Sequence, residues 1–382
     1  MSDRTQTARA AADALRQFAA NLDQHPVVIG FDGFVDSIID VVDKRHDLQN
    51  YERVKTIDQL GHKFIEAGGK SSNYELVTKL EKLGGNGPIM ANAMTRTGFA
   101  VTYLGALGHP ALHPVFQAFA ERARCESFSE PGYTDALEFD DGKIMLGKHS
   151  GLKDVNAQRM VEVVGEAKLR EILGGCRLLG MVNWTMLTNV DGIWAYLIEK
   201  VLPDLPDPPE GRRTVFVDLT DPEKRTAEDL AGALDRCRQF QSVCDVVCGY
   251  NLKEAVQVAE VLGLEVSDDP ESKIELMAKA IRKLLNVRGV VIHPRGGAAA
   301  AIDTAQGVQS AVFSGPLVKV PKLSTGAGDN FNAGFCLGML AGLPVEQILC
   351  VGTATSGYYV RNAASPTLDQ LADFCDDLPA PE

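Results

Sequence analysis

The sequence predicts an α/β domain with a mostly parallel sheet and helices on both of its faces. Three observations lead to this class. Strand-like apolar runs alternate with helical segments from residue 155 onward, glycine-rich turns precede two helices, and polar residues directly follow several strands. Such alternation gives parallel strands joined by right-handed crossovers, and ligands of such proteins bind at the carboxyl ends of the strands. We therefore expect the functional residues at that edge.

Composition places the chain among globular enzymes. It has 382 residues, of which 45% are hydrophobic and 23% charged, and its formal net charge is −13. The negative charge argues against nucleic acid or an anionic membrane as a partner, and no stretch has the length of a membrane span. The eight cysteines lack C-x-x-C pairing and lie mostly in apolar stretches, which is typical of reduced thiols in a cytoplasmic protein.

Residues 1–26 are expected to form a helical extension, and the main domain to cover 27–382. Arg4 to Leu22 has the alanine-rich amphipathic pattern of a helix. Its arginines resemble those of a transit peptide, but Asp13 and the lack of an apolar centre or cleavage site argue against one. We therefore expect this helix to pack on the domain.

The first strand, Val27–Gly30, leads to two carboxylates, Asp32 in a turn and Asp36 in the strand that follows. An ionised carboxylate can accept hydrogen bonds from two adjacent hydroxyl groups, as sugar sites require. The simpler interpretation of each is a solvated turn residue. The polar stretch 44–72 has no assigned role beyond extending a lid or an oligomer contact.

A paired glycine then precedes a helix. Gly84 and Gly85 would let a ligand approach bare backbone at the start of this helix, and Asn86 offers both a donor and an acceptor. An ordinary loop explains the glycines equally well. Val101–Gly105 is the next predicted strand, and residues 113–124 the next predicted helix.

Residues 134–149 alternate as a β-hairpin about a turn at Asp141-Gly142. Thr134, Glu138 and Lys148 are possible ligand contacts on it, although surface positions on an edge hairpin are the simpler interpretation.

Four further strands are predicted at residues 178–182, 214–218, 245–249 and 289–293, and polar side chains follow three of them: Asn183, Asp218 and Asn251. Asn251 and Glu254 stand at the start of a helix, three residues apart. This spacing fits a capping box and also a pair of polar ligands at the edge of the sheet.

The most informative stretch is residues 321–340. A turn at Thr325-Gly326-Ala327-Gly328 leads to Asp329 and then to a run apolar enough for a core helix. The free N–H groups and the dipole of a helix N-terminus favour phosphate there. Asp329 would lie beside that anion, placed to accept a proton from a hydroxyl group; a plain N-cap is the simpler interpretation.

This stretch resembles the C-terminal signature DTTGAGDxFxAG of the PfkB/ribokinase family of carbohydrate and nucleoside kinases. The matching run is residues 324–329, followed by Phe331, Ala333 and Gly334, while residues 84–98 resemble the family's N-terminal signature GGKGxNxAxxxxxLG and Asn251 to Glu254 its N-x-x-E motif. The resemblance covers roughly residues 27–370. It implies a ribokinase-like three-layer α/β/α fold with a small β-sheet lid, from segments near 34–60 and 130–150.

The resemblance also implies roles for individual residues. Asp329 would be the general base, and the turn of Gly326, Ala327 and Gly328 the anion hole. Asn251 and Glu254 would orient magnesium-bound water. The acceptor would be held by these residues: Asp36, which matches the family's sugar-binding aspartate better than Asp32 does, and Asp32, Gly84, Gly85, Asn86 and Asn183.

Four departures from the family pattern limit these assignments. Ile89 replaces a frequent sugar-binding asparagine, and Leu323 replaces the aspartate that helps to hold potassium in cation-activated relatives. The segment with Lys224 and Arg225 lacks the asparagine of a D-x-N-x-R motif. The glycines after His293 are displaced from the family's nucleotide turn, which leaves the adenine contacts unassigned.

We therefore expect magnesium-dependent transfer of the γ-phosphoryl group of ATP to a hydroxyl group of a sugar or sugar-like molecule. No direct protein ligand of the metal is assigned. A nucleoside or vitamin-alcohol kinase of the same fold, or a sugar-sensing protein without turnover, is the alternative. The lid is a possible homodimer contact, and neither the acceptor nor its reacting hydroxyl group follows from the sequence.

Overall fold

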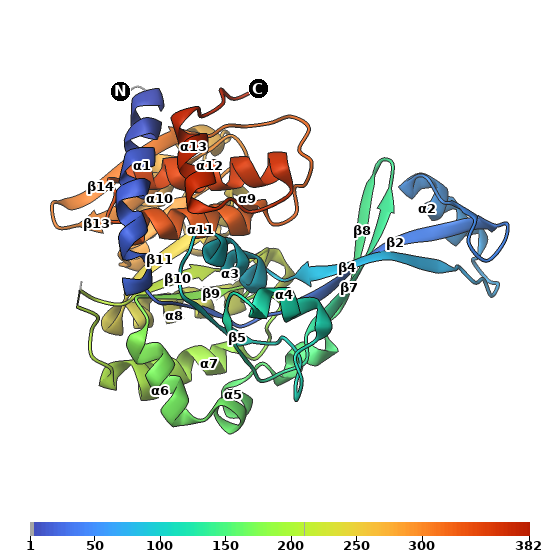
Figure 1. Ribbon diagram of the computed structural model, residues 1–382, viewed down its shortest axis with the longest axis horizontal. Helices are drawn as coiled ribbons and strands as arrows, with labels where there is room; N and C mark the ends of the chain where they lie inside the picture. The colour runs from blue at the N-terminus through green and yellow to red at the C-terminus, as the bar shows by residue number, and fades with distance from the viewer. Residues whose placement is uncertain (1–3, 210) are drawn as a thin grey trace.

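The computed structural model describes residues 4–209 and 211–382. Within them the core is a nine-stranded sheet in the order β14-β13-β12-β11-β10-β9-β1-β5-β6 (Figure 1). From β12 to β6 the strands are parallel, and the antiparallel hairpin of β13 and β14 lies at one edge. The strands are β1 Val27–Gly30, β5 Val101–Gly105, β6 Arg124–Ser127, β9 Leu178–Val182, β10 Thr214–Asp218, β11 Asp245–Tyr250, β12 Gly289–Ile292, β13 Gly297–Thr304 and β14 Gly307–Ser314.

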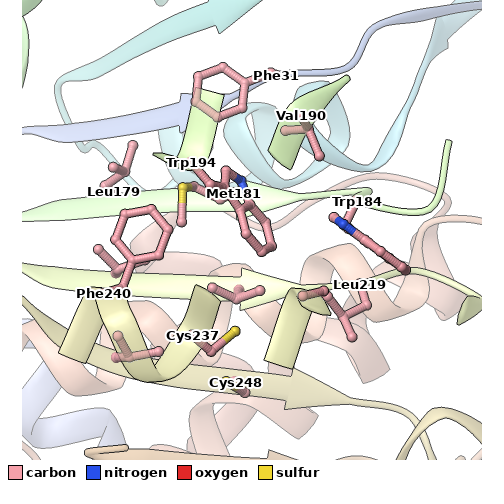
Figure 2. Packing of buried hydrophobic residues seen from close by; sticks show 14 of the residues in the cluster. Phe31, Leu179, Met181, Trp184, Val190, Trp194, Leu219, Cys237, Phe240 and Cys248 are labelled. Atoms are coloured by element: carbon pink, nitrogen blue, oxygen red, sulfur yellow. The ribbon is translucent and has the colours of Figure 1, made fainter. Parts of the chain in front are cut away.

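The strands alternate their side chains between two hydrophobic cores, one on each face of the sheet. In β10, for example, Val215 and Val217 belong to one core and Phe216 to the other. Trp184, Trp194 and neighbouring residues fill the first core (Figure 2). It is covered by α5 Ala157–Val164, α6 Glu166–Gly175, α7 Val190–Tyr196, α8 Ala227–Val243, α9 Leu252–Val261 and α10 Ile274–Leu285. The second is covered by α1 Arg4–Phe18, α3 Asn86–Arg96, α11 Ala327–Leu340, α12 Val345–Asn362 and α13 Leu368–Asp376. The predicted three-layer arrangement is confirmed.

A smaller sheet, which we call the lid, projects from this core (Figure 1). Its long strand β2 pairs with β7 in parallel and with β3 and β4 antiparallel, and β7 pairs with β8. The strands are β2 Phe34–Arg45, β3 Tyr51–Arg53, β4 Leu76–Gly84, β7 Gly132–Phe139 and β8 Gly142–Lys148, and α2 Ile57–Glu66 packs against them. The polar stretch 44–72 thus supplies β3 and α2 of the lid.

Two sequence predictions differ from the structure. The helix expected over residues 113–124 is only a 3₁₀ turn, Pro114–Phe116, and α4, Gln117–Ala120, because the following residues pair with β5 as the edge strand β6. The hairpin turn is at Asp140 and Asp141 rather than Asp141-Gly142, since Phe139 pairs directly with Gly142.

The N-terminal helix α1 continues as a 3₁₀ turn, Ala19–Gln24, and packs against α12 and α13. Arg16 forms ion pairs with Asp373 and Asp376 at 2.9 and 2.6 Å. Residues 1–3 of the predicted extension lie outside the described part of the chain. No helix among the described residues has the length and hydropathy to cross a bilayer.

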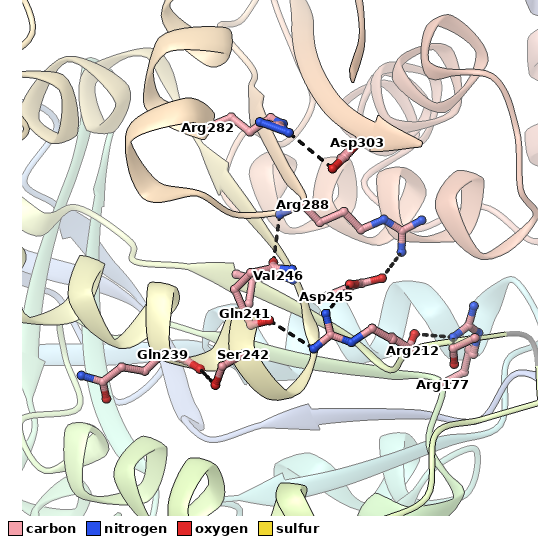
Figure 3. Close-up of polar contacts among 11 residues, drawn as sticks. Arg177, Arg212, Gln239, Gln241, Ser242, Asp245, Val246, Arg282, Arg288 and Asp303 are labelled. Atoms are coloured by element: carbon pink, nitrogen blue, oxygen red, sulfur yellow. Dashed lines mark hydrogen bonds and ion pairs between the residues drawn. The ribbon is translucent and has the colours of Figure 1, made fainter. Parts of the chain in front are cut away.

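A polar network fixes the strands at their amino ends, opposite the expected site (Figure 3). The Asp245 carboxylate accepts hydrogen bonds from Arg212 at 3.2 Å and Arg288 at 3.1 Å. The Gln241 side-chain oxygen accepts from the backbone N–H groups of Val246 and Arg288 at 2.8 and 2.9 Å. The starts of β11 and β12 are therefore held together by shared hydrogen-bond partners. The polar residues of the expected site follow the opposite, carboxyl ends of the strands.

Candidate active site

Asp329 lies in the first turn of α11, at the carboxyl edge of the sheet. Gly326 is the N-cap of this helix and has φ +90°, a conformation that favours glycine. The Ala327 N–H donates to the Ser324 carbonyl oxygen at 3.1 Å, whereas no acceptor is found among the described residues for the N–H groups of Gly328 and Asp329. Free N–H groups therefore face a cavity of about 520 Å³, and such groups attract anions.

The Asp329 carboxylate is almost fully buried and points to the start of α3. The Asn86 side chain donates to Asp329 Oδ1 at 2.9 Å, so the two signature glycine segments meet here. Burial, followed by the charge of Asp218, raises the pKa of Asp329 well above its usual range. A carboxylate with a raised pKa binds a proton more tightly, which is the property of a general base.

Two further buried carboxyl groups face the same cavity: Asp218 at the carboxyl end of β10 and Glu254 in the first turn of α9. Asp218 accepts from Asn332 Nδ2 at 2.6 Å, and burial raises its pKa. Glu254 is 4% exposed and accepts from the backbone N–H groups of Asn251 and Asp221, both at 2.9 Å. Burial and then the Asp218 charge raise the pKa of Glu254 to about 8.

Asn251 and Glu254 form a complete capping box at the N-terminus of α9. The prediction of a capping box at these two residues is therefore confirmed. A helix cap alone does not explain why the Glu254 carboxyl group is buried in the lining of the cavity beside Asp218. One pair of residues can start the helix and present a carboxylate to a ligand.

A pH dependence of stability follows from Glu254. An acid whose pKa is raised on folding favours the folded state when protonated, so its contribution is full below pH 4.5 and is lost as the pH rises toward about 8. We expect the melting temperature to fall by about 5 °C over this window. Glu254→Gln should flatten the slope in scanning calorimetry, while Glu260→Gln on the exposed face of α9 should keep it. An unchanged slope in Glu254→Gln would contradict the assignment.

On the acceptor side, Asp36 lies near the root of the lid, on β2. A Cβ atom on Gly84 would overlap the Asp36 carboxyl group, so the glycine is required for this approach. Burial raises the pKa of Asp36, and the Lys82 charge opposes that rise. Thr134 is buried beside it, at the paired position of β7.

Asp32 is fully buried and its oxygens are already engaged. Oδ1 accepts from the Gly87 N–H at 2.9 Å, and Oδ2 accepts from the Asn86 N–H at 2.9 Å and from Asn183 Nδ2 at 2.7 Å. Burial raises the pKa of Asp32 to about 6 against these hydrogen bonds. The carboxylate thus anchors the N-terminus of α3, and with it the Gly85-Asn86 turn, where an anion is favourable.

His293, directly after β12, is a lining residue that the sequence left without a role. Its ring stacks on Phe331 with 4.4 Å between centroids, and its Nε2 finds no hydrogen-bond partner in the described part of the chain. Burial lowers the pKa of His293 to about 4, so a neutral imidazole faces the cavity near Gly328. The rest of the cavity is lined mainly by segments the sequence did not single out, among them Pro316, Leu317, Val318, Thr353, Ser356, Gly357 and Val360.

Other candidates are engaged elsewhere. Lys224 pairs with Asp221 at 3.1 Å, and the Arg225 guanidinium lies 4.0 Å from the Trp184 ring centroid. On the lid surface, Glu138 pairs with Lys143 at 3.8 Å, and Lys148 pairs with Asp135 at 2.8 Å.

The donor set fits a hydrated divalent cation better than a directly bound one. No group of three histidine, cysteine, aspartate or glutamate side chains within residues 4–209 and 211–382 is arranged to hold a metal. Burial raises the pKa values of Asp218, Glu254 and Asp329, and a cation near these carboxyl groups would favour their ionised forms. Magnesium commonly keeps its waters and bridges such carboxylates to phosphate.

A search of family models decides the relationship of the chain. The model of prokaryotic ketohexokinase matches residues 3–378. The chain belongs to the prokaryotic ketohexokinase family. It is therefore a sugar kinase, a phosphotransferase that acts on a sugar hydroxyl group.

Relatives agree with this family. A ketohexokinase from Haloferax volcanii is 30% identical over 372 residues, which cover 96% of this chain and 95% of the relative. A 5-dehydro-2-deoxygluconokinase from Geobacillus thermodenitrificans is 26% identical over 144 residues, or 36% of this chain and 39% of that one.

Solved structures confirm the ribokinase-like fold. Phosphofructokinase-2 from Escherichia coli matches with a TM-score of 0.62 at 15% identity, covering 93% of this chain and 99% of that one. Arabidopsis thaliana ribokinase, solved with ribose and ATP, matches with a TM-score of 0.61 at 16% identity, covering 92% and 99%. At such identities the likeness establishes the fold alone.

Proposed function

We propose that this sugar kinase transfers the γ-phosphoryl group of ATP to a hydroxyl group of a ketohexose. The observation that carries the proposal is the position of Asp329: it is buried at the N-terminus of α11, hydrogen-bonded to Asn86, and borders the cavity with the free N–H group of Gly328. The family match and the Haloferax ketohexokinase support a ketohexose as the acceptor.

In this mechanism Asp36 accepts hydrogen bonds from the sugar hydroxyl groups, and the bare backbone of Gly84 and Gly85 lets the ring approach. Asp329 takes the proton of the attacking hydroxyl group as its oxygen bonds to the γ-phosphorus and the bond to the ADP oxygen breaks. Asn86 orients Asp329. The Gly328 N–H group and the dipole of α11 stabilise the charge on the transferring group.

Magnesium, when bound, neutralises charge on the phosphates. Glu254 and Asp218 would hold it through water molecules, and Asn251 would keep Glu254 in place through the capping box. In this proposal Asp32 and Asn183 do not contact the sugar. They fix the position of the start of α3 through their hydrogen bonds.

The test is ADP release from Mg-ATP across a panel of ketohexoses, aldohexoses, polyols and nucleosides. We expect release that depends on a ketohexose, with a kcat/KM at least about tenfold higher than for any nucleoside. Release that depends on a nucleoside instead would replace the proposed acceptor, and ATP consumption without any acceptor would remove the transfer reaction.

We also propose that the lid forms a homodimer. A row across four strands, on the same face as Asp36, contains Leu80, Ile38, Ala136 and Met145. The outer two of these are about half exposed, at 56% and 46%, and exposed apolar strands invite a partner.

The dimer is tested by light scattering after size-exclusion chromatography. Leu80→Glu and Met145→Glu should each give a monomer. Leu276→Glu, at an exposed leucine of α10 away from the lid, should leave the mass unchanged. A monomeric wild-type protein at about 50 μM would contradict the proposal.

A further inference from the structure

A second cavity lies on the outer face of α3. Its volume is about 420 Å³. Its lining includes Asp36 of the candidate acceptor site and Thr325, and also Arg96 at the end of α3 and Arg122 after α4. We call it the α3 groove.

The α3 groove is positively charged in a chain whose net charge is −13. Lys82, Arg96 and Arg122 line it, and Asp36 is the single carboxylate among its lining residues. No carboxylate of the described residues lies within ion-pair distance of Arg96 or Arg122, whereas Arg16 and Arg170 do form ion pairs. Lys82 forms no such pair either, although its charge acts on Asp36 across the strands. Three cations and one carboxylate on one cavity give an electrostatic preference for an anion.

The geometry favours a group that reaches out of the acceptor site. Ile89, Asn92 and Arg96 follow one face of α3 along the groove, and Ile89 to Arg96 spans about 10 Å at 1.5 Å per residue. Arg96 is the last residue of α3 and lines the same cavity as Asp36. The Arg122 side chain is held by a hydrogen bond to Asn92 Oδ1 at 2.8 Å.

Leu323 contributes by lacking a charge. It lines the groove as an uncharged side chain. A carboxylate there would cancel one of the cations, whereas leucine leaves three positive side chains opposite Asp36. An uncharged side chain at this position therefore keeps the groove suitable for an anion.

We propose that the α3 groove binds the phosphate group of a sugar phosphate. Three cations from β4, α3 and the segment after α4 match a dianion with three terminal oxygens better than a carboxylate with one charge and two oxygens. The sugar phosphate is either an acceptor that is already phosphorylated, with its sugar at Asp36, or a separate effector. The kinetic consequence rests on the proposed ketohexose kinase function, and the binding itself does not.

Calorimetric titration tests the binding. Fructose 1-phosphate, fructose 6-phosphate and inorganic phosphate are titrated into the full-length protein at low ionic strength, with fructose as the uncharged control. We expect at least one sugar phosphate to bind, and Arg96→Gln and Arg122→Gln each to weaken it about tenfold. Arg9→Gln, at an exposed arginine of α1, removes the same charge and should leave affinity unchanged. No binding at 10 mM, or equal binding in both groove variants, would overturn the proposal.

Measurement of ADP release shows whether the bound sugar phosphate is an acceptor or a separate effector. If the sugar phosphate is the acceptor, it supports ADP release alone, and Arg96→Gln raises its KM but not that of fructose. If it is an effector, it supports no release alone but changes the KM for fructose in wild type and not in Arg96→Gln. Absence of ADP release with every sugar would contradict the proposed function, while calorimetry would still decide the groove.

Discussion

Asp329→Asn is expected to lower kcat by a factor of 10² to 10⁴ and to make the protein more stable. The loss corresponds to roughly 3 to 5 kcal/mol of transition-state stabilisation, because the amide cannot take the hydroxyl proton. The stability rises because burial and the neighbouring carboxylates raise the pKa of Asp329. At a pH above the ordinary pKa of an aspartate, the ionised side chain therefore destabilises the folded state, and asparagine removes this effect. The amide oxygen can still accept from Asn86, and we expect a rise in melting temperature of about 2 °C or more at pH 8.

The paired measurements are steady-state kinetics with saturating Mg-ATP and scanning calorimetry without ligand. Asp369→Asn is a matched control, since Asp369 also lies in the first turn of a helix but is exposed, and it should change neither quantity. Turnover near the wild-type value would remove Asp329 from the mechanism. A lower melting temperature would show that the buried charge is compensated in the free protein.

The second large effect is expected from Asp32→Ala, on stability. The substitution leaves three buried donors without their acceptor: the N–H groups of Asn86 and Gly87 and the amide of Asn183. Unsatisfied buried donors cost about 1 to 3 kcal/mol each, offset in part by removal of a carboxylate whose pKa is raised. We expect a net loss of about 3 kcal/mol in urea unfolding.

Asp36→Ala is the matched comparison, because it tests the other buried carboxylate of this segment, four residues further on in β2. It should raise the KM for the acceptor at least about tenfold with little loss of stability and an unchanged KM for ATP. If Asp32→Ala instead folded normally and lost only acceptor affinity, the two assignments would be reversed.

Features that depend on adjacent residues could be predicted from the sequence, whereas features that depend on contacts between distant residues could not. The turn before Asp329, the start of α9 and the first strand are coded by adjacent residues, and the structure has them within a residue or two. β4 was not identified because Leu76, Leu80 and Leu83 repeat at helical spacing, and its strand state depends on pairing with β2.

The candidate site was predictable only in part for the same reason. Asp32 and Asp36 are four residues apart, and either could be a sugar ligand by chemistry. Only the fold shows that Asp32 meets Asn183, 151 residues away, whereas Asp36 lies against Gly84. The α3 groove joins six separate segments, so no local pattern could indicate it.

The lid has a mechanical consequence. Strand β2 extends from Phe34 to Arg45, with shifts in its pairing register at Ile38/Ile39 against β4 and at Val42/Lys44 against β3. Its root is fixed where the Gly33 carbonyl oxygen accepts the Gly132 N–H at 2.8 Å. At about 3.3 Å per residue the strand is a lever nearly 40 Å long, and Asp36 lies close to its fulcrum. A swing of about 10 Å at the tip would move Asp36 by about 2 Å, enough to break a hydrogen bond. If Asp36 binds the sugar as proposed, its hydrogen bonds to the sugar would therefore change with the position of the lid tip, and any contact at the tip would affect them.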